Sequence, residues 1–169
     1  VSNALGALGY SPVVSSDKEA ISQSDGLILP GVGAFGEAMS NLTGLGIIET
    51  LREQVLEQKK PFLGICLGMQ LLFDGSQEDA PAPGDPVAGL GVLRGQVVRF
   101  EGDVFGRGKL KVPHMGWNTL QWQRDDPLMQ GLGEDPAVYF VHGYYAEPDE
   151  TRGETVICTT ADYGRRFAA

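Results

Sequence analysis

A cysteine flanked by two glycines is the residue in this sequence best placed to do chemistry. Cys66 lies in the segment KPFLGICLGMQ, between Gly64 and Gly68. Residues 61–65 form a short apolar run of buried-strand length, and the apolar spacing over residues 67–73 favours a helix. Cys66 is therefore predicted at a sharp strand-to-helix turn, and Gly-x-Cys-x-Gly has the spacing of a nucleophile elbow.

The chemistry predicted for Cys66 is nucleophilic attack on a carbonyl carbon. A helix that begins directly after the cysteine favours thiolate over thiol, because its first N–H groups carry partial positive charge. A second interpretation fits the same residues, since a free cysteine is often a small buried residue that ends a core strand. The spacing alone leaves both interpretations open.

A glycine-containing loop is the second feature that could contribute to a site. The apolar run Gly26–Leu29 is followed by Pro30-Gly31-Val32-Gly33. Glycines can adopt the positive φ that turns backbone N–H groups toward a bound oxyanion. An ordinary turn between a strand and a helix is the alternative.

Both histidines of the sequence lie in its second half. His142 ends the apolar segment AVYFVH and is the default candidate for the base that a cysteine nucleophile needs, although it could instead line the site or be buried. His114 begins the segment His-Met-Gly-Trp-Asn, residues 114–118. An imidazole, an indole and a carboxamide around a glycine are more typical of a binding surface than of a hairpin core; a packed Trp beside a satisfied His is the alternative.

The segments that would position these residues follow the order of an α/β fold. Helical spacing begins at residue 1 and is ended by Gly9, and it returns over residues 34–60 with a break near 43–46. Short apolar runs predict strands at 12–16, 26–29 and 61–65. Strands and helices that alternate at these lengths predict a parallel sheet, so the glycine loop and Cys66 should be neighbours at its carboxyl edge.

The pattern changes after residue 73. Residues 74–89 are rich in Pro, Gly, Asp and Ala and are predicted to form an exposed loop. From Val92 onward, short alternating runs broken by glycines predict antiparallel strands or hairpins, with further strands at 137–148 and 155–160. A short helical turn is expected around Leu128, Met129 and Leu132. The sheet as a whole is therefore expected to be mixed.

Chain length, net charge and the counts of cysteine and histidine limit the class of protein to which this sequence can belong. One domain, residues 1–169, is expected, and a chain of this length can bury a core without disulfides or metal. The net charge of −9 argues against a nucleic-acid partner, because phosphate contacts need clustered Lys and Arg. No apolar run approaches the roughly 20 residues that span a bilayer, so no membrane insertion is expected. Two cysteines and two histidines without close pairing predict no metal site and a reducing compartment.

Five segments together resemble one family across nearly the whole chain: LPGVGAFGEAM, PFLGICLGMQLL, GLGVLRGQVVRF, KVPHMGWN and YFVHGYY. They are similar, in this order, to the class I (triad) glutamine amidotransferases. HMGWN followed by YFVH resembles in particular the branch that serves as glutaminase subunit of imidazole glycerol phosphate synthase in histidine biosynthesis.

The resemblance implies a three-layer, flavodoxin-like α/β fold with a central, mainly parallel sheet and an antiparallel extension. It implies a cytoplasmic enzyme without a cofactor that hydrolyses L-glutamine to glutamate and ammonia. The ammonia would pass to a (β/α)8 cyclase subunit, with which the chain would form a heterodimer. A glutaminase for another acceptor pathway, or a degenerate amidotransferase that is only an interaction module, are the alternatives.

The resemblance also implies roles for particular residues. Cys66 would form the glutamyl thioester, and its tetrahedral intermediate would be held by the backbone N–H groups of Leu67, Val32 and Gly33. Substrate glutamine would be contacted by Gln70 and by the backbone around His142, Gly143 and Tyr144, where Gly143 replaces the expected Ser or Thr. The residues that match cyclase-facing positions are Trp117, Asn118 and Tyr139.

Two departures from the family pattern limit these roles. The family's base and its orienting carboxylate come from a QFHPE-like motif, and none occurs in residues 1–169. The family's first strand and its glycine-rich loop would precede Val1. We therefore expect the sequence to be a fragment that lacks both segments and is inactive as given. Neither His114 nor His142 has the matching context, so neither is assigned as the base.

Overall fold

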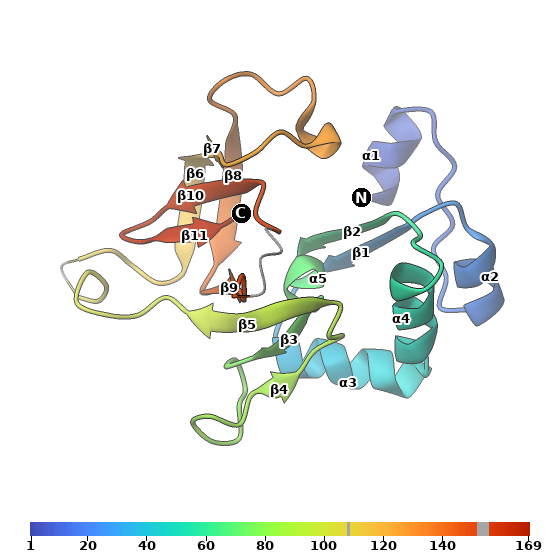
Figure 1. The fold of residues 1–169 in the computed structure, drawn as a ribbon, viewed down its shortest axis with the longest axis horizontal. Coiled ribbons are helices and arrows are strands. Elements are labelled where there is room, and N and C mark those ends of the chain that lie inside the picture. The colour runs from blue at the N-terminus through green and yellow to red at the C-terminus, as the bar shows by residue number, and fades with distance from the viewer. Residues whose placement is uncertain (108, 152–155) are drawn as a thin grey trace.

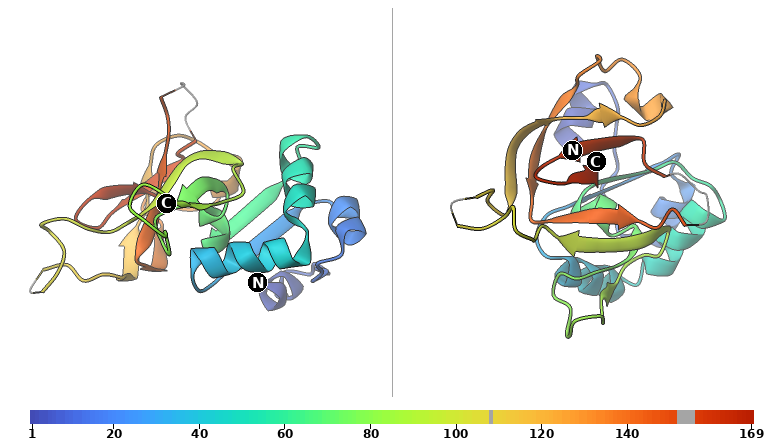
Figure 2. Two further views of the ribbon diagram at one scale, coloured as in Figure 1. Left: turned by 90° about the horizontal axis from the view of Figure 1, so that it is seen from below. Right: turned by 60° about the vertical axis from the view of Figure 1, so that its left-hand side comes forward.

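A computed structural model of the chain describes residues 1–107, 109–151 and 156–169. The chain divides into an α/β half, built mainly from the first 70 residues, and a β-rich half that follows it (Figure 1). The left view in Figure 2 shows the same side-by-side arrangement of the two halves. No helix within the described ranges is long and apolar enough to cross a membrane.

The α/β half contains the predicted helices and strands except for the strand at 12–16, and it adds a helix at 18–23 that was not predicted. It contains α1 (Ser2–Ala7), α2 (Lys18–Gln23), β1 (Leu27–Gly31), α3 (Phe35–Leu45), α4 (Ile48–Leu56), β2 (Phe62–Cys66) and α5 (Leu67–Gln70). The predicted break between two helices is confirmed at Gly46, whose φ of +67° ends α3 in a left-handed conformation. Strands β1 and β2 pair in parallel, as predicted.

Three predictions for this region are wrong. Residues 12–16 form no strand, and Val13 and Val14 are exposed. The helix after Cys66 ends at Gln70, and residues 74–89 are not simply a loop, because they contain most of β3 (Phe73–Ser76) and all of β4 (Val87–Ala88). Burial explains β3: Phe73 and Ser76 lie in the interior, and small residues such as Gly75 and Ser76 carry no hydrophobic signal in sequence.

The β-rich half contains the alternating segments predicted after Val92. Its elements are β5 (Leu93–Arg99), β6 (His114–Thr119), β7 (Gln121–Trp122), the 3-10 turn η1 (Pro127–Met129), β8 (Ala137–His142), β9 (Tyr144–Pro148), β10 (Thr159–Asp162) and β11 (Arg166–Ala168). The turn at η1 was predicted. The predicted strand 155–160 begins only at Thr159, and its first residue, Thr155, lies outside the described residues.

The strands of the described residues form four small sheets, β1-β2, β4-β3-β5-β9, β6-β8 and β11-β10-β7. Parallel pairing occurs between β1 and β2 and between β3 and β5, and the other pairs are antiparallel. The α/β class and the antiparallel extension are thus confirmed. The parallel part is smaller than predicted, because the strands from β6 onward pair only antiparallel. The three-layer arrangement stays a prediction.

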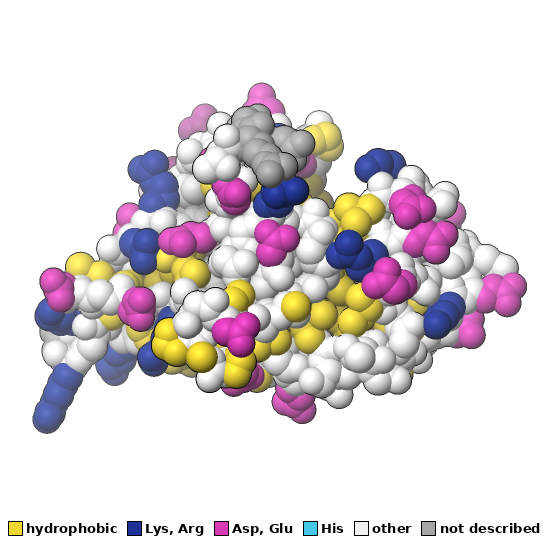
Figure 3. Space-filling model, turned by 60° about the horizontal axis from the view of Figure 1, so that its bottom comes forward, with side chains coloured by type: hydrophobic (Ala, Val, Ile, Leu, Met, Phe, Trp, Pro, Cys, Tyr) yellow, Lys and Arg dark blue, Asp and Glu magenta, His cyan; other side chains and the backbone are white. Residues whose placement is uncertain are grey.

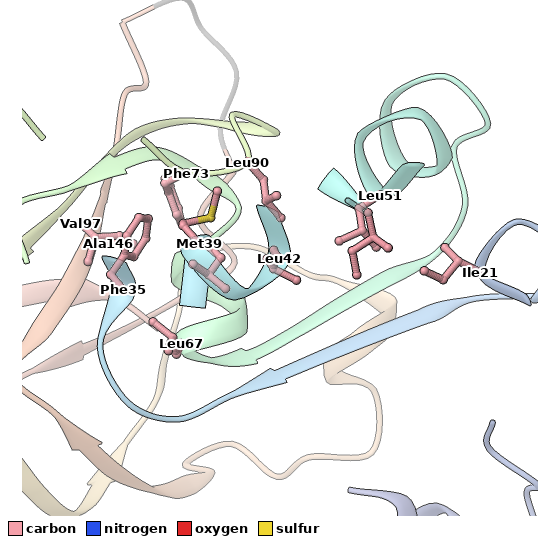
Figure 4. Close-up of a cluster of buried hydrophobic side chains, with 12 residues drawn as sticks. Ile21, Phe35, Met39, Leu42, Leu51, Leu67, Phe73, Leu90, Val97 and Ala146 are labelled. Atoms are coloured by element: carbon pink, nitrogen blue, oxygen red, sulfur yellow. The ribbon is translucent and has the colours of Figure 1, made fainter. Parts of the chain in front are cut away.

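Strands β5 and β9 form a wall between two hydrophobic cores. Val97 and Ala146 are register partners that face the first core, which also contains Phe35 and Leu67 (Figure 4). Their neighbours Val98 and Tyr145 face the second core, around Phe100 and Phe167. Successive side chains of a strand point to opposite faces, so this one pair of strands contributes to both cores.

Charged side chains of both signs are interspersed over the face shown in Figure 3, where Lys and Arg lie among Asp and Glu. The described residues form two ion pairs, Arg124 with Asp126 and Arg165 with Glu147. Both pairs are exposed, and exposed pairs contribute little to stability. The fold therefore depends on its two cores and on the hydrogen bonds that join them.

Candidate active site

Cys66 lies at the junction of β2 and α5 in a conformation that residues other than glycine rarely adopt. Its φ is +55° and its ψ is −118°, outside the regions that suit residues with a Cβ. A strained residue persists only when its surroundings hold it in place, and such residues are concentrated at functional sites. The predicted strand-to-helix elbow is confirmed, and the Cys66 side chain is exposed as a nucleophile must be.

The two flanking glycines allow the elbow to pack against its neighbours. A Cβ on Gly64 would lie 2.5 Å from the Cα of Met69, and a Cβ on Gly68 would lie 1.7 Å from the carbonyl oxygen of Leu29. Helix α5 thus folds back over β2 and touches the backbone of β1. The Gly-x-Cys-x-Gly spacing follows from close backbone contact on both sides of Cys66.

The glycine loop lies beside Cys66, as predicted. Gly31, the last residue of β1, is the register partner of Cys66. Gly33, two residues further on, has φ +98° and Val32 is fully exposed. The loop and the first turn of α5 therefore meet at the carboxyl edge of the β1-β2 pair. A cavity of about 290 Å³ is lined in part by Gly31, Val32 and Leu67.

Glu78 forms a hydrogen bond just after the glycine loop, at the start of α3, and nothing in the sequence pointed to this role. Its Oε2 accepts a 2.9 Å hydrogen bond from the backbone N–H of Phe35, the first residue of α3. The first N–H groups of a helix lack partners within the helix, so a carboxylate there satisfies one of them and suits the helix dipole. Glu78 and Phe35 are 43 residues apart in sequence, so only the fold brings this carboxylate to the start of α3.

Gln70 links the Cys66 elbow to strand β9, which separates the two cores together with β5. Its side chain is 7% exposed, and its Nε2 donates a 2.9 Å hydrogen bond to the carbonyl oxygen of Tyr144 on β9. Gln70, Tyr144 and Cys66 are thereby brought to one region, as the predicted glutamine site requires. Direct contact of Gln70 and of residues 142–144 with glutamine stays a prediction.

The two histidines are in contact with each other. His114 Nδ1 lies 3.3 Å from His142 Nε2, and His142 Nδ1 lies 2.8 Å from the Tyr144 carbonyl oxygen. A carbonyl only accepts, so His142 Nδ1 carries a proton. Burial lowers the pKa of His142, opposed by this hydrogen bond. Burial, and then the repulsion that two charged imidazoles would have for each other, lowers the pKa of His114. Both imidazoles are therefore neutral at pH 7.

This arrangement argues against either histidine as the base for Cys66. Both ring nitrogens of His142 are engaged, one by Tyr144 and one by His114. His114 is 3% exposed and stacks between Phe140 and Tyr163, with ring centroids 4.9 and 4.0 Å away. Within the part of the chain that the structure describes, no hydrogen bond joins the Cys66 sulfur to an imidazole.

The lowered pKa values predict how stability depends on pH. The unfolded imidazoles protonate near their ordinary pKa of 6.5, whereas the folded ones stay neutral to lower pH. Below pH 6.5 the unfolded state therefore binds more protons, and we expect the free energy of unfolding to fall as pH decreases from 7.5 to 5.5. Urea unfolding at several pH values measures this. A double variant His114→Phe, His142→Gln should show a flatter profile; an equally steep one would assign the effect to other groups.

Four exposed apolar side chains form one face of the β6-β8 sheet, which we call the partner face: Met115, Trp117, Tyr139 and Val141. Trp117 and Tyr139 are register partners with ring centroids 5.6 Å apart and exposures of 72% and 54%. The side chain of Asn118 lies on the opposite face of the sheet, where its Nδ2 donates to the Asp162 carbonyl oxygen at 2.8 Å. The roles predicted for these residues stay predictions.

The second cysteine has a different environment. Cys158 donates to Asp126 Oδ2 at 3.3 Å, and its sulfur accepts from Arg124 Nε at 3.2 Å. Both contacts tie the Cys158 sulfur to neighbouring side chains in a partly buried position. Of the two cysteines, Cys66 has the geometry of a nucleophile.

An α/β fold with an exposed cysteine at a strand-to-helix elbow, beside a glycine loop, defines a class of enzymes that attack carbonyl carbons through a thiolate. The model of the family "Glutamine amidotransferase class-I" matches residues 2–169. A solved structure described as a glutamine amidotransferase is similar in fold, with a TM-score of 0.64 at 21% identity over 97% of this chain and 78% of that one. The chain belongs to the class-I glutamine amidotransferase family and is an enzyme.

Closer relatives place the chain within that family. It is 48% identical to imidazole glycerol phosphate synthase subunit HisH of Syntrophotalea carbinolica, over 96% of this chain and 75% of that protein. The identity is 49% to the same subunit of Geobacillus kaustophilus, over 96% and 72%, and 44% to that of Aquifex aeolicus, over 100% and 75%. The chain is thus a member of the HisH family.

Proposed function

We propose that Cys66 is the nucleophile with which this chain, as the glutaminase subunit of imidazole glycerol phosphate synthase in histidine biosynthesis, hydrolyses L-glutamine in the cytoplasm. The strained elbow beside the glycine loop is the observation that carries the assignment, because Cys66 and Gly31 are register partners at the edge of a parallel pair. Membership of the HisH family supplies the substrate and the pathway.

In the proposed reaction, the Cys66 thiolate attacks the carboxamide carbon of glutamine. The negative charge that develops on the carboxamide oxygen is held by the N–H of Leu67, at the start of α5, and by N–H groups of Val32 and Gly33; one such donor contributes about 3 kcal/mol. The buried side chain of Leu67 fixes the position of its N–H. A proton passes to the nitrogen, ammonia leaves, and a thioester remains on Cys66. Water then attacks the thioester, releases glutamate and restores the thiolate.

The reaction requires a base, and we propose that it comes from outside residues 1–169. Both nitrogens of His142 are engaged within the β-rich half, and His114 is enclosed by aromatic rings. An imidazole that cannot reach the nucleophile without breaking two hydrogen bonds is a poor general base.

A glutaminase assay in the presence of the cyclase subunit tests this assignment. We expect the full-length protein to release ammonia from glutamine and residues 1–169 alone to release none above background. Activity of residues 1–169 that is abolished by His142→Ala would make His142 the base and contradict the proposal. Equal stability of the two forms, checked by thermal unfolding, separates a missing base from a missing fold.

We propose that the ammonia passes to a (β/α)8 cyclase subunit, which binds as a heterodimer partner at the partner face. Two exposed aromatic side chains in edge-to-face contact on one face of a sheet suit a binding hot spot, because Trp and Tyr bury large areas at low cost in side-chain entropy. The strands that carry them also carry His114 and His142 on the opposite side, so the face lies directly over the histidine pair.

Replacing Trp117 by alanine is expected to weaken binding of the cyclase subunit by about 2 kcal/mol, or roughly 30-fold in Kd. Isothermal titration calorimetry of the full-length variant measures the change. Trp122 offers a matched control: it is less exposed than Trp117, lies on β7, and its Nε1 donates to the Glu134 carbonyl oxygen. An unchanged Kd for Trp117→Ala, or an equal loss for Trp122→Ala, would place the interface elsewhere.

A further inference from the structure

Four groups form a continuous hydrogen-bond chain from β6 to the elbow helix, which we call the imidazole relay: the Asn118 amide, the His114 and His142 rings and the Tyr144 carbonyl. Asn118 Nδ2 lies 3.5 Å from His114 Nε2, a long contact, and the two imidazoles are 3.3 Å apart. His142 Nδ1 and Gln70 Nε2 then meet on the same carbonyl oxygen, at 2.8 and 2.9 Å. The imidazole relay therefore reaches α5, the helix that follows Cys66, through the carbonyl oxygen that Gln70 also contacts.

The relay has a single direction. The Tyr144 carbonyl only accepts, so His142 Nδ1 donates and, in the neutral ring, Nε2 accepts. His114 Nδ1 must then donate to that nitrogen, which leaves His114 Nε2 as the acceptor for the Asn118 amide. The amide is oriented independently, because Asn118 Oδ1 accepts from the Thr119 N–H at 2.9 Å and Nδ2 donates to the Asp162 carbonyl. One pair of tautomers satisfies every group.

Packing fixes the relay in place. The His114 ring is parallel within 19° to the rings of Phe140 and Tyr163, which lie on either side of it in the second core. The His142 ring packs against Phe100 and Phe167, each with its centroid 5.2 Å away. Rings enclosed in this way have one available orientation, so the protons that they carry determine where the Tyr144 carbonyl points.

We propose that His114 and Asn118 are positioning residues for glutamine binding: through His142 they fix the Tyr144 carbonyl, which in turn fixes the Gln70 amide. Two donors occupy the two lone pairs of this carbonyl. Loss of the His142 donor leaves one lone pair unfilled and lets this carbonyl shift within the β5-β9 ladder, which weakens its hold on Gln70, one helical turn beyond Cys66. The inference deepens the proposed function, on which it rests for the substrate.

The test uses two substitutions at His114. His114→Phe keeps the stacked ring and removes both nitrogens, whereas His114→Asn keeps a donor near the position of Nδ1. In the full-length complex with the cyclase subunit, we expect His114→Phe to raise KM for glutamine about 10-fold with kcat within about 3-fold. Residues that only bind the substrate stabilise the ground state and the transition state equally. His114→Asn should recover most of the KM.

Tyr163→Phe is the matched control, because it keeps the ring on His114 and removes a hydrogen bond to the Lys111 carbonyl that lies outside the relay. It should leave KM and kcat unchanged. A KM for His114→Phe equal to that of the native protein, or a His114→Asn variant that is stable yet no better than His114→Phe, overturns the proposal.

The ring tautomers give a readout that needs neither activity nor a variant. In ¹⁵N spectra of the full-length complex at pH 7.5, we expect both His114 and His142 to be neutral with the proton on Nδ1. A proton on Nε2 of His142 overturns the relay even if the enzyme is active. A complex that shows the expected tautomers but hydrolyses no glutamine contradicts the proposed function but still supports the imidazole relay.

Discussion

Replacing Cys66 by serine is expected to lower the glutaminase kcat of the full-length complex at least about 10³-fold. The hydroxyl has the right size for the elbow, so the loss reflects chemistry rather than folding. A serine hydroxyl is a much weaker nucleophile than a thiol and needs a base that removes its proton during attack. The oxyanion donors proposed at Leu67 and the glycine loop remain, so a small residual rate is expected.

Cys158→Ser provides the matched control within the same chain. This thiol is partly buried and donates to Asp126, and it lies away from β1, β2 and α5 in the β-rich half. The serine hydroxyl can make the same hydrogen bond, so kcat and KM are expected to stay within about 2-fold of the native values. Steady-state ammonia release, with thermal unfolding of each variant, measures both effects. Loss of activity in Cys158→Ser with Cys66→Ser active would exchange the two roles.

The elbow was predictable because its determinants are local. The spacing of Gly64, Cys66 and Gly68, and the change from strand to helix around them, lie within a few residues, and the parallel pairing of β1 with β2 follows from the order of elements. The structure adds the reason for the glycines, which is contact with Met69 and with the backbone of β1. The contact of Gly68 with Leu29 on β1 joins residues far apart in sequence and has no signature in the sequence itself.

The pairing of the two histidines was not predictable in the same way. His114 and His142 are register partners on β6 and β8, and the register is set by the packing of the whole sheet rather than by either segment. From the sequence, His142 was an isolated imidazole and thus the default base for Cys66. The contact with His114 gives it a different chemistry, because a donor fills the nitrogen that a base would use.

Strand alternation separates two residues that the sequence grouped together. Trp117 and Asn118 are adjacent, and the resemblance of their segment to the family predicts a partner-facing role for both. In β6 they point to opposite faces: Trp117 is exposed beside Tyr139, and the Asn118 amide bonds to Asp162 and approaches His114. Only the strand assignment, which motif matching does not use, distinguishes an exposed residue that can contact a partner from one whose side chain is turned toward the interior.

Gly68→Ala is expected to lower the free energy of unfolding by about 4 kcal/mol or more, a size reserved for substitutions with a specific steric cause. The new Cβ would lie 1.7 Å from the Leu29 carbonyl oxygen and 2.7 Å from its carbonyl carbon. Both are backbone atoms of β1, so no side chain can rotate away to relieve the contact, and overpacking costs more where the neighbours cannot move. Helix α5 would have to separate from β1, and Leu67, Gln70 and the Cys66 elbow would move with it.

Gly44→Ala is the matched control, since Gly44 lies in α3 and a Cβ there meets nothing within 4 Å. Alanine is the better helix former, so this variant should gain about 0.5 to 1 kcal/mol. Urea unfolding of the two variants beside the native protein measures the difference. Because the same displacement would carry the N–H of Leu67 away from the glycine loop, any folded Gly68→Ala protein should also lose glutaminase activity. A variant with native stability would show that α5 can shift without cost, and the elbow would then not be held by its contact with β1.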